Sequence, residues 1–291
     1  MKNILVLTDF SERAMSAAEY AMQLAIHIKA DITLCHALEI TQQLTYPLAD
    51  HLVLRNQTVK RLRALGMHLN TFVEGHSEDD FSPSISYIND LDMLPDVVEK
   101  LVSNNHFDLV VIGATKSSSV SRFFFGSHTS DILDFVTRPV LLVPENVSFK
   151  SIDNVAYATD LTFNNTKVIN YLAQLATVFG ARITVDHITP LDLPLTKAEQ
   201  AVEDSLINQM EAKNVRISYK TLKGDSVAKG LLELSDAEKV DILTLVHKRY
   251  DFFEGLFHSS VSKQLAYTSK IPLLVMPYSF SVDNEDLVYA G

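Results

Sequence analysis

The feature that most constrains this sequence is an internal repeat. Residues 1–37 align without a gap on residues 152–188 at an offset of 151, which places Thr8-Asp9 on Thr159-Asp160 and His36 on His187. The back halves align at an offset of 133, with HFDLVVIG over KVDILTLV and TRPVLLVP over KIPLLVMP. This period is far longer than the roughly 20–50 residues of a solenoid repeat. The chain is therefore predicted to be two copies of one folding unit.

Each copy alternates short apolar segments with amphipathic ones. Strands are predicted at residues 3–8, 31–38, 84–89, 107–112 and 139–143, and again at residues 153–158, 182–188, 215–221, 240–246 and 272–276. Helices are predicted near residues 12–29, 50–68, 93–104, 164–179, 196–213 and 225–238, with a further helix before the last strand of each copy. Ser11 and Thr162 stand where helix N-caps are expected.

Strands that are apolar on both faces and alternate with helices indicate a parallel sheet covered on both sides. The expected fold class is therefore α/β, with two tandem five-stranded, Rossmann-like domains. We place the first domain at residues 1–147, the second at residues 148–280, and a tail at residues 281–291.

Charge and cysteine content narrow the classes of function. The 25 Lys and Arg residues against 36 Asp and Glu give a net charge of −11 without a clustered basic face, which argues against nucleic-acid binding. Cys35 is the single cysteine and lies in an apolar strand, so it is predicted to be a small core residue in a reducing compartment. The chain opens directly into a strand-like segment, and no window approaches the roughly 18 apolar residues of a membrane span. We therefore expect a cytoplasmic protein that does not bind membranes.

Candidate ligand-binding residues lie where the predicted strands end. In sheets of this kind, ligands bind beyond the carboxyl ends of the strands at the point where strand order reverses. Asp9 and Ser11 follow the first strand, where a carboxylate can accept hydrogen bonds from a ribose or an adenine amine. The segment GATKSSSVSRFFFGS, residues 113–127, follows the fourth strand and leads into a helix whose N-terminus can meet a phosphate. His36 and His187 stand at no metal-ligand spacing, and a structural role is predicted for both.

With these residues in place, the chain resembles the universal stress protein A family over residues 2–145 and 152–278. ATP-binding members of that family carry G-x-x-G, nine residues, then Gly-Ser or Gly-Thr, together with an early aspartate at the end of the first strand. Gly113, Gly126, Ser127 and Asp9 match this pattern, whereas Lys116 replaces the second glycine. The Lys116 ammonium can contact phosphates, or its side chain can fill the space that they need, and both readings stay open.

The resemblance implies further properties. It implies an adenine nucleotide alpha hydrolase-like domain that binds ATP, with Mg²⁺, in the first copy, and an adenine-side wall near Ala37 at the end of the second strand. Family subunits pair as dimers, so the two copies are expected to form a pseudo-dimer within the chain through the apolar segments PVLLVP and PLLVMP. The chain as a whole is a candidate homodimer.

The second copy departs further from the pattern. Asp160 remains, but the residues aligned with Gly113, Lys116, Gly126 and Ser127 are Val246, Arg249, Ser259 and Ser260. A β-branched valine is unfavourable if the position requires positive φ, so the loop of the second copy is predicted to follow a different path. Any nucleotide site is therefore expected in the first copy.

Three functions from different classes remain open. The leading hypothesis is a stress-response regulatory or sensor protein that binds ATP or another adenine nucleotide in its first copy. The second is a nucleotide-free scaffold that binds partner proteins. The third is a slow ATPase, for which the sequence offers no general base beyond Asp9, so an enzyme is the less favoured reading.

Overall fold

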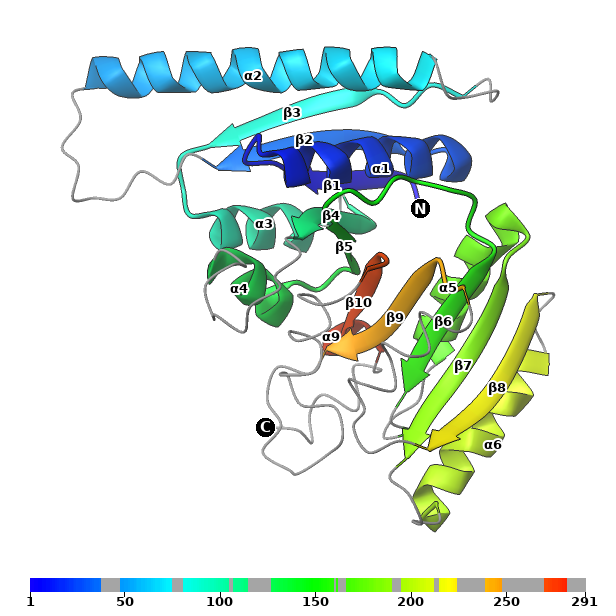
Figure 1. The fold of residues 1–291 in the computed structure, drawn as a ribbon. Helices are drawn as coiled ribbons and strands as arrows, with labels where there is room; N and C mark the ends of the chain where they lie inside the picture. Colours follow the sequence, from blue (N-terminus) through cyan, green and yellow to red (C-terminus); the bar gives the residue numbers. More distant parts are fainter. Residues whose placement is uncertain are drawn as a thin grey trace. The chain divides into compact units, whose positions relative to one another are not determined.

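The computed structural model divides the chain into two compact units, residues 1–149 and residues 150–291. It describes residues 1–37, 48–74, 81–104, 107–114, 127–159, 161, 166–189, 195–211, 215–223, 239–247 and 270–281. Both units are α/β, as the repeat predicts (Figure 1).

The first unit contains five parallel strands in the order β3-β2-β1-β4-β5. Its strands are β1 (Asn3–Leu7), β2 (Asp31–Ala37), β3 (Ile85–Asp90), β4 (Leu109–Ala114) and β5 (Val140–Pro144). Its helices are α1 (Glu12–Ile28), α2 (Leu48–Glu74), α3 (Leu94–Ser103) and α4 (Ser127–Phe135). Every strand lies within three residues of its predicted position.

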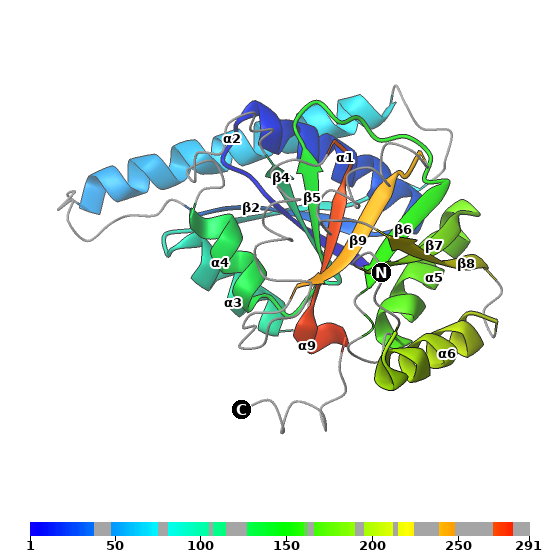
Figure 2. The same ribbon diagram turned by 60° about the horizontal axis from the view of Figure 1, so that its bottom comes forward.

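Strand order reverses between β1 and β4, and the helices divide accordingly. Helix α1 contacts α2, and α3 contacts α4, as Figure 1 and Figure 2 show for α3 and α4. The chain moves from β1 to β3 in one direction across the sheet and from β3 to β5 in the other. Because such crossovers are right-handed, α1 and α2 cover one face of the sheet and α3 and α4 cover the other. The interior strands are the core: Ile4, Leu5 and Val6 of β1 and Val110 and Val111 of β4 have no exposed surface.

The second unit repeats this order with strands β10-β9-β6-β7-β8, all parallel. These strands are β6 (Asn154–Thr159), β7 (Arg182–Thr189), β8 (Arg216–Lys223), β9 (Ile242–His247) and β10 (Leu273–Pro277). The described helices are α5 (Thr166–Phe179), α6 (Lys197–Glu211) and the short α9 (Tyr278–Ser281). The helix predicted at residues 225–238 and the N-cap predicted at Thr162 lie outside the described residues.

The duplication extends to individual hydrogen bonds. Asp108 Oδ2 accepts from the backbone N–H groups of Lys2 and Asn3, and Asp241 Oδ2 accepts from those of Asp153 and Asn154. Each aspartate thus ties the start of the fourth strand of its unit to the start of the first. The two aspartates are related by the offset of 133, and the residues that donate to them are related by the offset of 151. The repeat in the sequence is therefore also a repeat in the structure.

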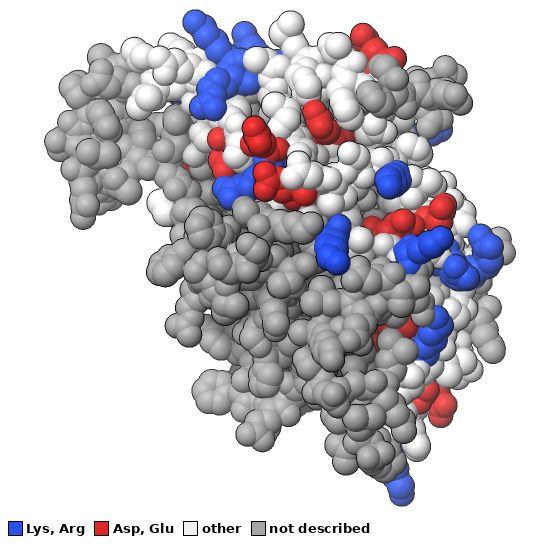
Figure 3. Space-filling model, in the orientation of Figure 1, with Lys and Arg blue, Asp and Glu red and all other residues white. Residues whose placement is uncertain are grey.

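Figure 3 shows both signs of charge on the described part of one face. Lys and Arg atoms gather at the top, where α2 lies, and Asp and Glu atoms occur elsewhere on that face. No helix among the described residues is both long enough and apolar enough to cross a membrane.

Candidate functional site

The turn after β1 is held in a strained conformation. Phe10 has φ 64°, a left-handed conformation that side chains other than glycine rarely adopt. The Thr8 hydroxyl accepts a hydrogen bond from the Phe10 N–H at 3.0 Å and so fixes this turn. Strained backbone of this kind persists only where surrounding contacts hold it, and it is frequent at binding sites. The turn therefore presents Asp9 in one defined direction.

Asp9 is the centre of a small polar network. Its carboxylate accepts from the backbone N–H of Ser11 at 2.9 Å, from the Ser11 hydroxyl, and from the Arg13 guanidinium at 2.7 Å. Burial raises the pKa of Asp9, but the bonds from Ser11 and Arg13 and the charge of Arg13 together hold that pKa below its ordinary value. Asp9 is therefore an ionised acceptor at neutral pH. About half of its side chain, 48%, remains exposed and accessible to a ligand.

Ser11 also starts helix α1, as predicted. Its backbone is extended, and its side-chain oxygen accepts from the Ala14 N–H at 3.4 Å. Arg13, in the first turn of the same helix, was not among the sequence candidates. Its spacing of four residues from Asp9 was the available signal, because residues that far apart meet at a helix start. The guanidinium adds a cation beside the candidate site.

Gly113 lies in β4 directly beneath this first turn. A Cβ built at Gly113 would stand 2.5 Å from the backbone oxygen and 2.7 Å from the backbone carbon of Arg13. The glycine therefore lets β4 and α1 approach each other closely. Its φ lies outside the positive region, so the structure does not require left-handed backbone there. The sequence predicts that Gly113 gives backbone room to a phosphate, and that role stays a prediction. The structure adds that the glycine gives room to the helix that carries Arg13.

Two of the remaining predicted site residues, Ala37 and Ser127, lie in described elements. Ala37 is the last residue of β2, partly buried and paired in register with Asp90. Ser127 is the first residue of α4, so the predicted helix does start there. Lys116 and Gly126 lie outside the described residues. The structure therefore brings Asp9, Ser11 and Gly113 together.

An aromatic and basic cluster adjoins Asp9. The ring of Phe10 lies 4.7 Å from that of His36, measured between centroids, and the Arg61 guanidinium lies 4.0 Å from the centroid of Phe10. His36 Nδ1 is 2.6 Å from the backbone oxygen of Thr8. Because that oxygen can only accept, Nδ1 carries the proton and the histidine ties β2 to the end of β1. This bond supports the structural role predicted for His36.

The second unit builds the same turn from different residues. Leu161 has φ 57°, and the Thr159 hydroxyl accepts from its N–H at 3.1 Å. His187 Nδ1 lies 3.0 Å from the backbone oxygen of Thr159. The strained turn is therefore common to both units and does not by itself mark a nucleotide site. Asp160 lies outside the described residues.

The expectation for Val246 needs a correction. We expected a valine here to be unfavourable because the position might need positive φ, but Gly113 does not have positive φ. Val246 is accordingly accommodated in β9, 8% exposed and paired with Met276 of β10. The residues aligned with the rest of the loop, Arg249, Ser259 and Ser260, lie outside the described residues.

Among the described residues, the single cysteine and the possible metal ligands do not form a reactive centre. Cys35 is fully buried, and burial together with the charge of Asp90 raises its pKa to about 12, so its thiol is unreactive. Within the described ranges, no group of three His, Cys, Asp or Glu residues is placed to hold a metal ion.

Fold and site together define a class: an α/β protein made of two Rossmann-like units, with a polar turn at the strand-order reversal of the first. A model of the universal stress protein family matches residues 1–144 and again residues 151–277. The chain therefore belongs to the universal stress protein family, with the family domain in tandem. A comparison with curated proteins finds no match.

Solved structures share the fold at low sequence identity. A universal stress protein from Archaeoglobus fulgidus is 14% identical with a TM-score of 0.70, covering 94% of this chain and 98% of its own. The cytoplasmic domain of a prokaryotic cation chloride cotransporter is 11% identical with a TM-score of 0.55, covering 98% and 99%. A universal stress protein in complex with cAMP is 20% identical with a TM-score of 0.35, covering 43% and 97%. At these identities the likeness to the first two concerns the fold alone.

Proposed function

We propose that this protein is a regulatory or sensor protein that binds ATP or another adenine nucleotide in its first unit. The nucleotide lies beyond the carboxyl ends of β1 and β4, where strand order reverses. Asp9 accepts hydrogen bonds from the ribose or the adenine amine, and the start of α4 at Ser127 meets a phosphate.

The observation that carries the proposal is the meeting of Asp9, Ser11 and Arg13 with Gly113 at this reversal. The residues come from opposite sides of the strand-order change and are in contact through the first turn of α1. An ionised, half-exposed carboxylate and a partly exposed guanidinium suit a ligand that carries both hydroxyl donors and phosphate.

The same electrostatics favour binding over turnover. A general base is most effective when its pKa lies near the working pH. The bonds from Ser11 and Arg13 move the pKa of Asp9 further below that range. Asp9 is thus a strong hydrogen-bond acceptor and a weak base, and we propose a nucleotide-binding protein in preference to an ATPase.

The loop after β4 supplies the phosphate side of the proposal on sequence grounds. Gly126 lets backbone N–H groups approach an anion, whereas Ser259 at the aligned position of the second unit adds a side chain. This difference is the reason to place the site in the first unit. Lys116 either contacts the phosphates or obstructs them.

Titration calorimetry of the whole chain with ATP and Mg²⁺, ADP, AMP and cyclic AMP tests the proposal. Asp9→Ala should weaken binding by about 1.5–3 kcal/mol, or ten- to a hundredfold, because one charge-assisted hydrogen bond is lost. Gly126→Val should abolish binding. Glu12→Gln is the matched control, since it removes one negative charge from the neighbouring, exposed first turn of α1 and should leave affinity unchanged.

Lys116→Gly separates the two roles of that residue, weakening binding if the ammonium contacts phosphate and strengthening it if the side chain obstructs. Phosphate release with time measures any turnover. Absence of heat and of thermal shift with millimolar concentrations of all four nucleotides refutes the proposal, and the scaffold function then takes its place.

A further inference from the structure

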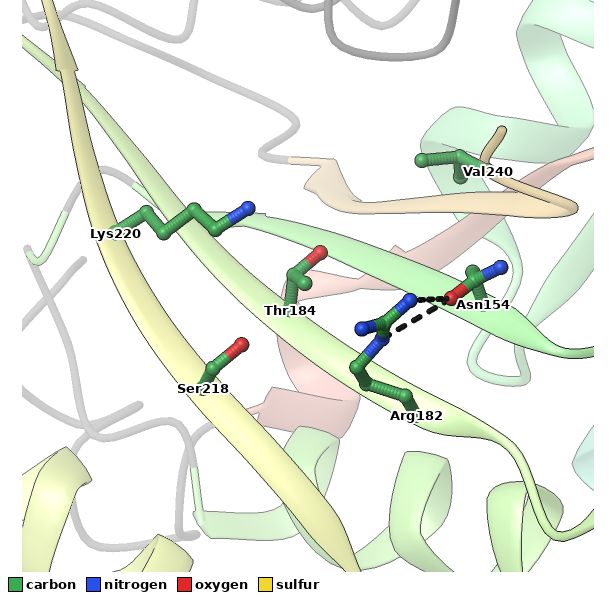
Figure 4. A pocket seen from close by; sticks show the side chains of 6 residues that line it. All are labelled: Asn154, Arg182, Thr184, Ser218, Lys220 and Val240. Carbon is green, nitrogen blue, oxygen red and sulfur yellow. Dashed lines mark hydrogen bonds between the residues drawn. The ribbon is translucent and has the colours of Figure 1, made fainter. Parts of the chain in front are cut away.

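A polar cavity of about 300 Å³ lies on the sheet of the second unit. It is lined by residues of β6, β7 and β8 and by one residue two positions before β9: Asn154, Arg182, Thr184, Ser218, Lys220 and Val240. Figure 4 shows the Arg182 guanidinium beside Asn154, with Thr184, Ser218 and Lys220 on the neighbouring stretch of β7 and β8. All six residues belong to one unit.

The cavity lies toward the amino ends of β6 and β7 in the second unit. Asn154 and Arg182 are the first residues of β6 and β7, and Val240 stands just before β9. The proposed nucleotide site lies beyond the carboxyl ends of strands and in the first unit. The two sites therefore share no residue.

Arg182 is held in place by Asn154. Its Nε and Nη2 donate to Asn154 Oδ1 at 3.1 and 2.7 Å, which fixes the plane of the guanidinium. The amide is neutral, and among the described residues no carboxylate lies within ion-pair distance of Arg182. Its positive charge is thus held in position without being neutralised there, and its Nη1 keeps donors beyond those used by Asn154.

The other side chains add donors. Thr184 and Ser218, paired in register across β7 and β8, each contribute a hydroxyl. Lys220 contributes an ammonium, and its register partner Asp186 is fully buried. The cavity lining thus carries two basic side chains, Arg182 and Lys220.

The first unit carries the same residue types at three of the six matching positions, Asn3, Thr33 and Ser86, but differs at the other three. Strand register equates Arg182 with Asp31 and Lys220 with Ile88, and the repeat alignment equates Val240 with Phe107. Asp31 is negative and accepts from the Ser84 N–H at 2.8 Å, and Phe107 is 7% exposed. The basic character is thus a property of the second unit alone, against a chain net charge of −11.

We propose that this cavity binds a small organic molecule that carries one phosphate group. The cavity lining offers a guanidinium, an ammonium and two hydroxyls. A phosphate, with three terminal oxygens, uses that many donors better than a carboxylate with two. The volume is at the lower end of small-molecule sites and leaves room for a compact organic part such as a sugar.

Calorimetry in phosphate-free buffer tests this with three probes on the whole chain: glucose 6-phosphate, inorganic phosphate and glucose. We expect saturable binding of glucose 6-phosphate below about 10 mM, weaker binding of inorganic phosphate, and none of glucose. Arg182→Gln should weaken glucose 6-phosphate binding by about ten- to a hundredfold, because a charged hydrogen-bond donor is lost.

Val240→Phe gives an independent test, since it fills the cavity with the residue that the first unit carries at this position and changes no charge. It should abolish binding while the circular dichroism spectrum stays native. Lys197→Gln is the charge-matched control, because Lys197 is exposed on α6 outside the cavity, and it should bind as the unmodified protein does.

Gly126→Val, which targets the first unit, should also leave glucose 6-phosphate binding intact, so this proposal and the nucleotide proposal fail separately. No binding of either phosphate by the unmodified chain overturns the inference. An equal loss of glucose 6-phosphate affinity in Lys197→Gln and Arg182→Gln overturns it too, because the attraction would then be a general effect of charge. Binding of glucose as tight as that of glucose 6-phosphate also overturns it.

Discussion

Gly113→Ala is expected to destabilise the first unit and to disturb the candidate site at the same time. The new Cβ would lie 2.5 Å from the Arg13 backbone oxygen, against an ordinary contact of 3.4–4 Å. Both atoms belong to regular elements, β4 and the first turn of α1, so neither moves without shifting an element. Overpacking of this kind costs about 1–3 kcal/mol, offset by about 0.4–1 kcal/mol from the stiffer unfolded chain. We expect a net loss near 1–2 kcal/mol.

Urea unfolding followed by circular dichroism measures this loss, and Gly66→Ala provides the matched control. A Cβ at Gly66 would meet the hydroxyl of Tyr87 at 2.2 Å, but that side chain is 40% exposed and can turn away. The position lies inside α2, where alanine is favoured over glycine by about 1 kcal/mol. Gly66→Ala should therefore be neutral or stabilising.

The same experiment reports on the site, because the displaced turn carries Ser11 and Arg13, which hold Asp9. Nucleotide affinity should fall in Gly113→Ala and stay unchanged in Gly66→Ala. The reasoning is refuted if Gly113→Ala unfolds at the same urea concentration as the unmodified protein, since the close approach of β4 and α1 would then not be a constraint.

Three further outcomes are expected. Lys29 and Gly180 both have left-handed φ, 54° and 64°. Lys29→Gly should therefore stabilise the protein by about 0.5–1 kcal/mol, and Gly180→Ala should destabilise it by about 1 kcal/mol. Equal urea midpoints for the two variants would contradict this. Cys35 should react with a thiol reagent at pH 8 only after denaturation, since it is buried with a pKa of about 12; stoichiometric labelling of the native chain would refute this. Residues 1–149 alone should be less soluble than the whole chain, because β5 ends the strand order of that unit with an apolar edge; a monomer at high concentration would argue against pairing of the two units.

Much of the fold was readable from the sequence because its signals are local or repeated. The apolar run at residues 3–8 becomes β1 at Asn3–Leu7, and Ser11 caps the helix that follows. Helix α2 spans Leu48–Glu74 and is longer than the predicted 50–68. Apolar residues recur only weakly at helical spacing along it, so the pattern that marks helix ends in a sequence is faint. The family pattern predicts Asp9 and Gly113 as nucleotide-site residues, which stays a prediction. In the structure both contact Arg13, Asp9 through the guanidinium and Gly113 through the backbone.

Other features depended on contacts between distant residues. Nothing local in the sequence shows that Gly113 meets the backbone of Arg13, a hundred positions earlier, or that Phe10 adopts positive φ. The cavity of the second unit is the clearest case. Asn154, Arg182 and Ser218 belong to three strands joined by long crossovers, and each looks like an ordinary surface residue in its own segment. Strand register alone brings them together, and register is fixed by packing of the whole sheet. The sequence by itself therefore determined the repeat, the fold class and the family pattern, whereas the tertiary structure decided which side chains share a surface and with what charge.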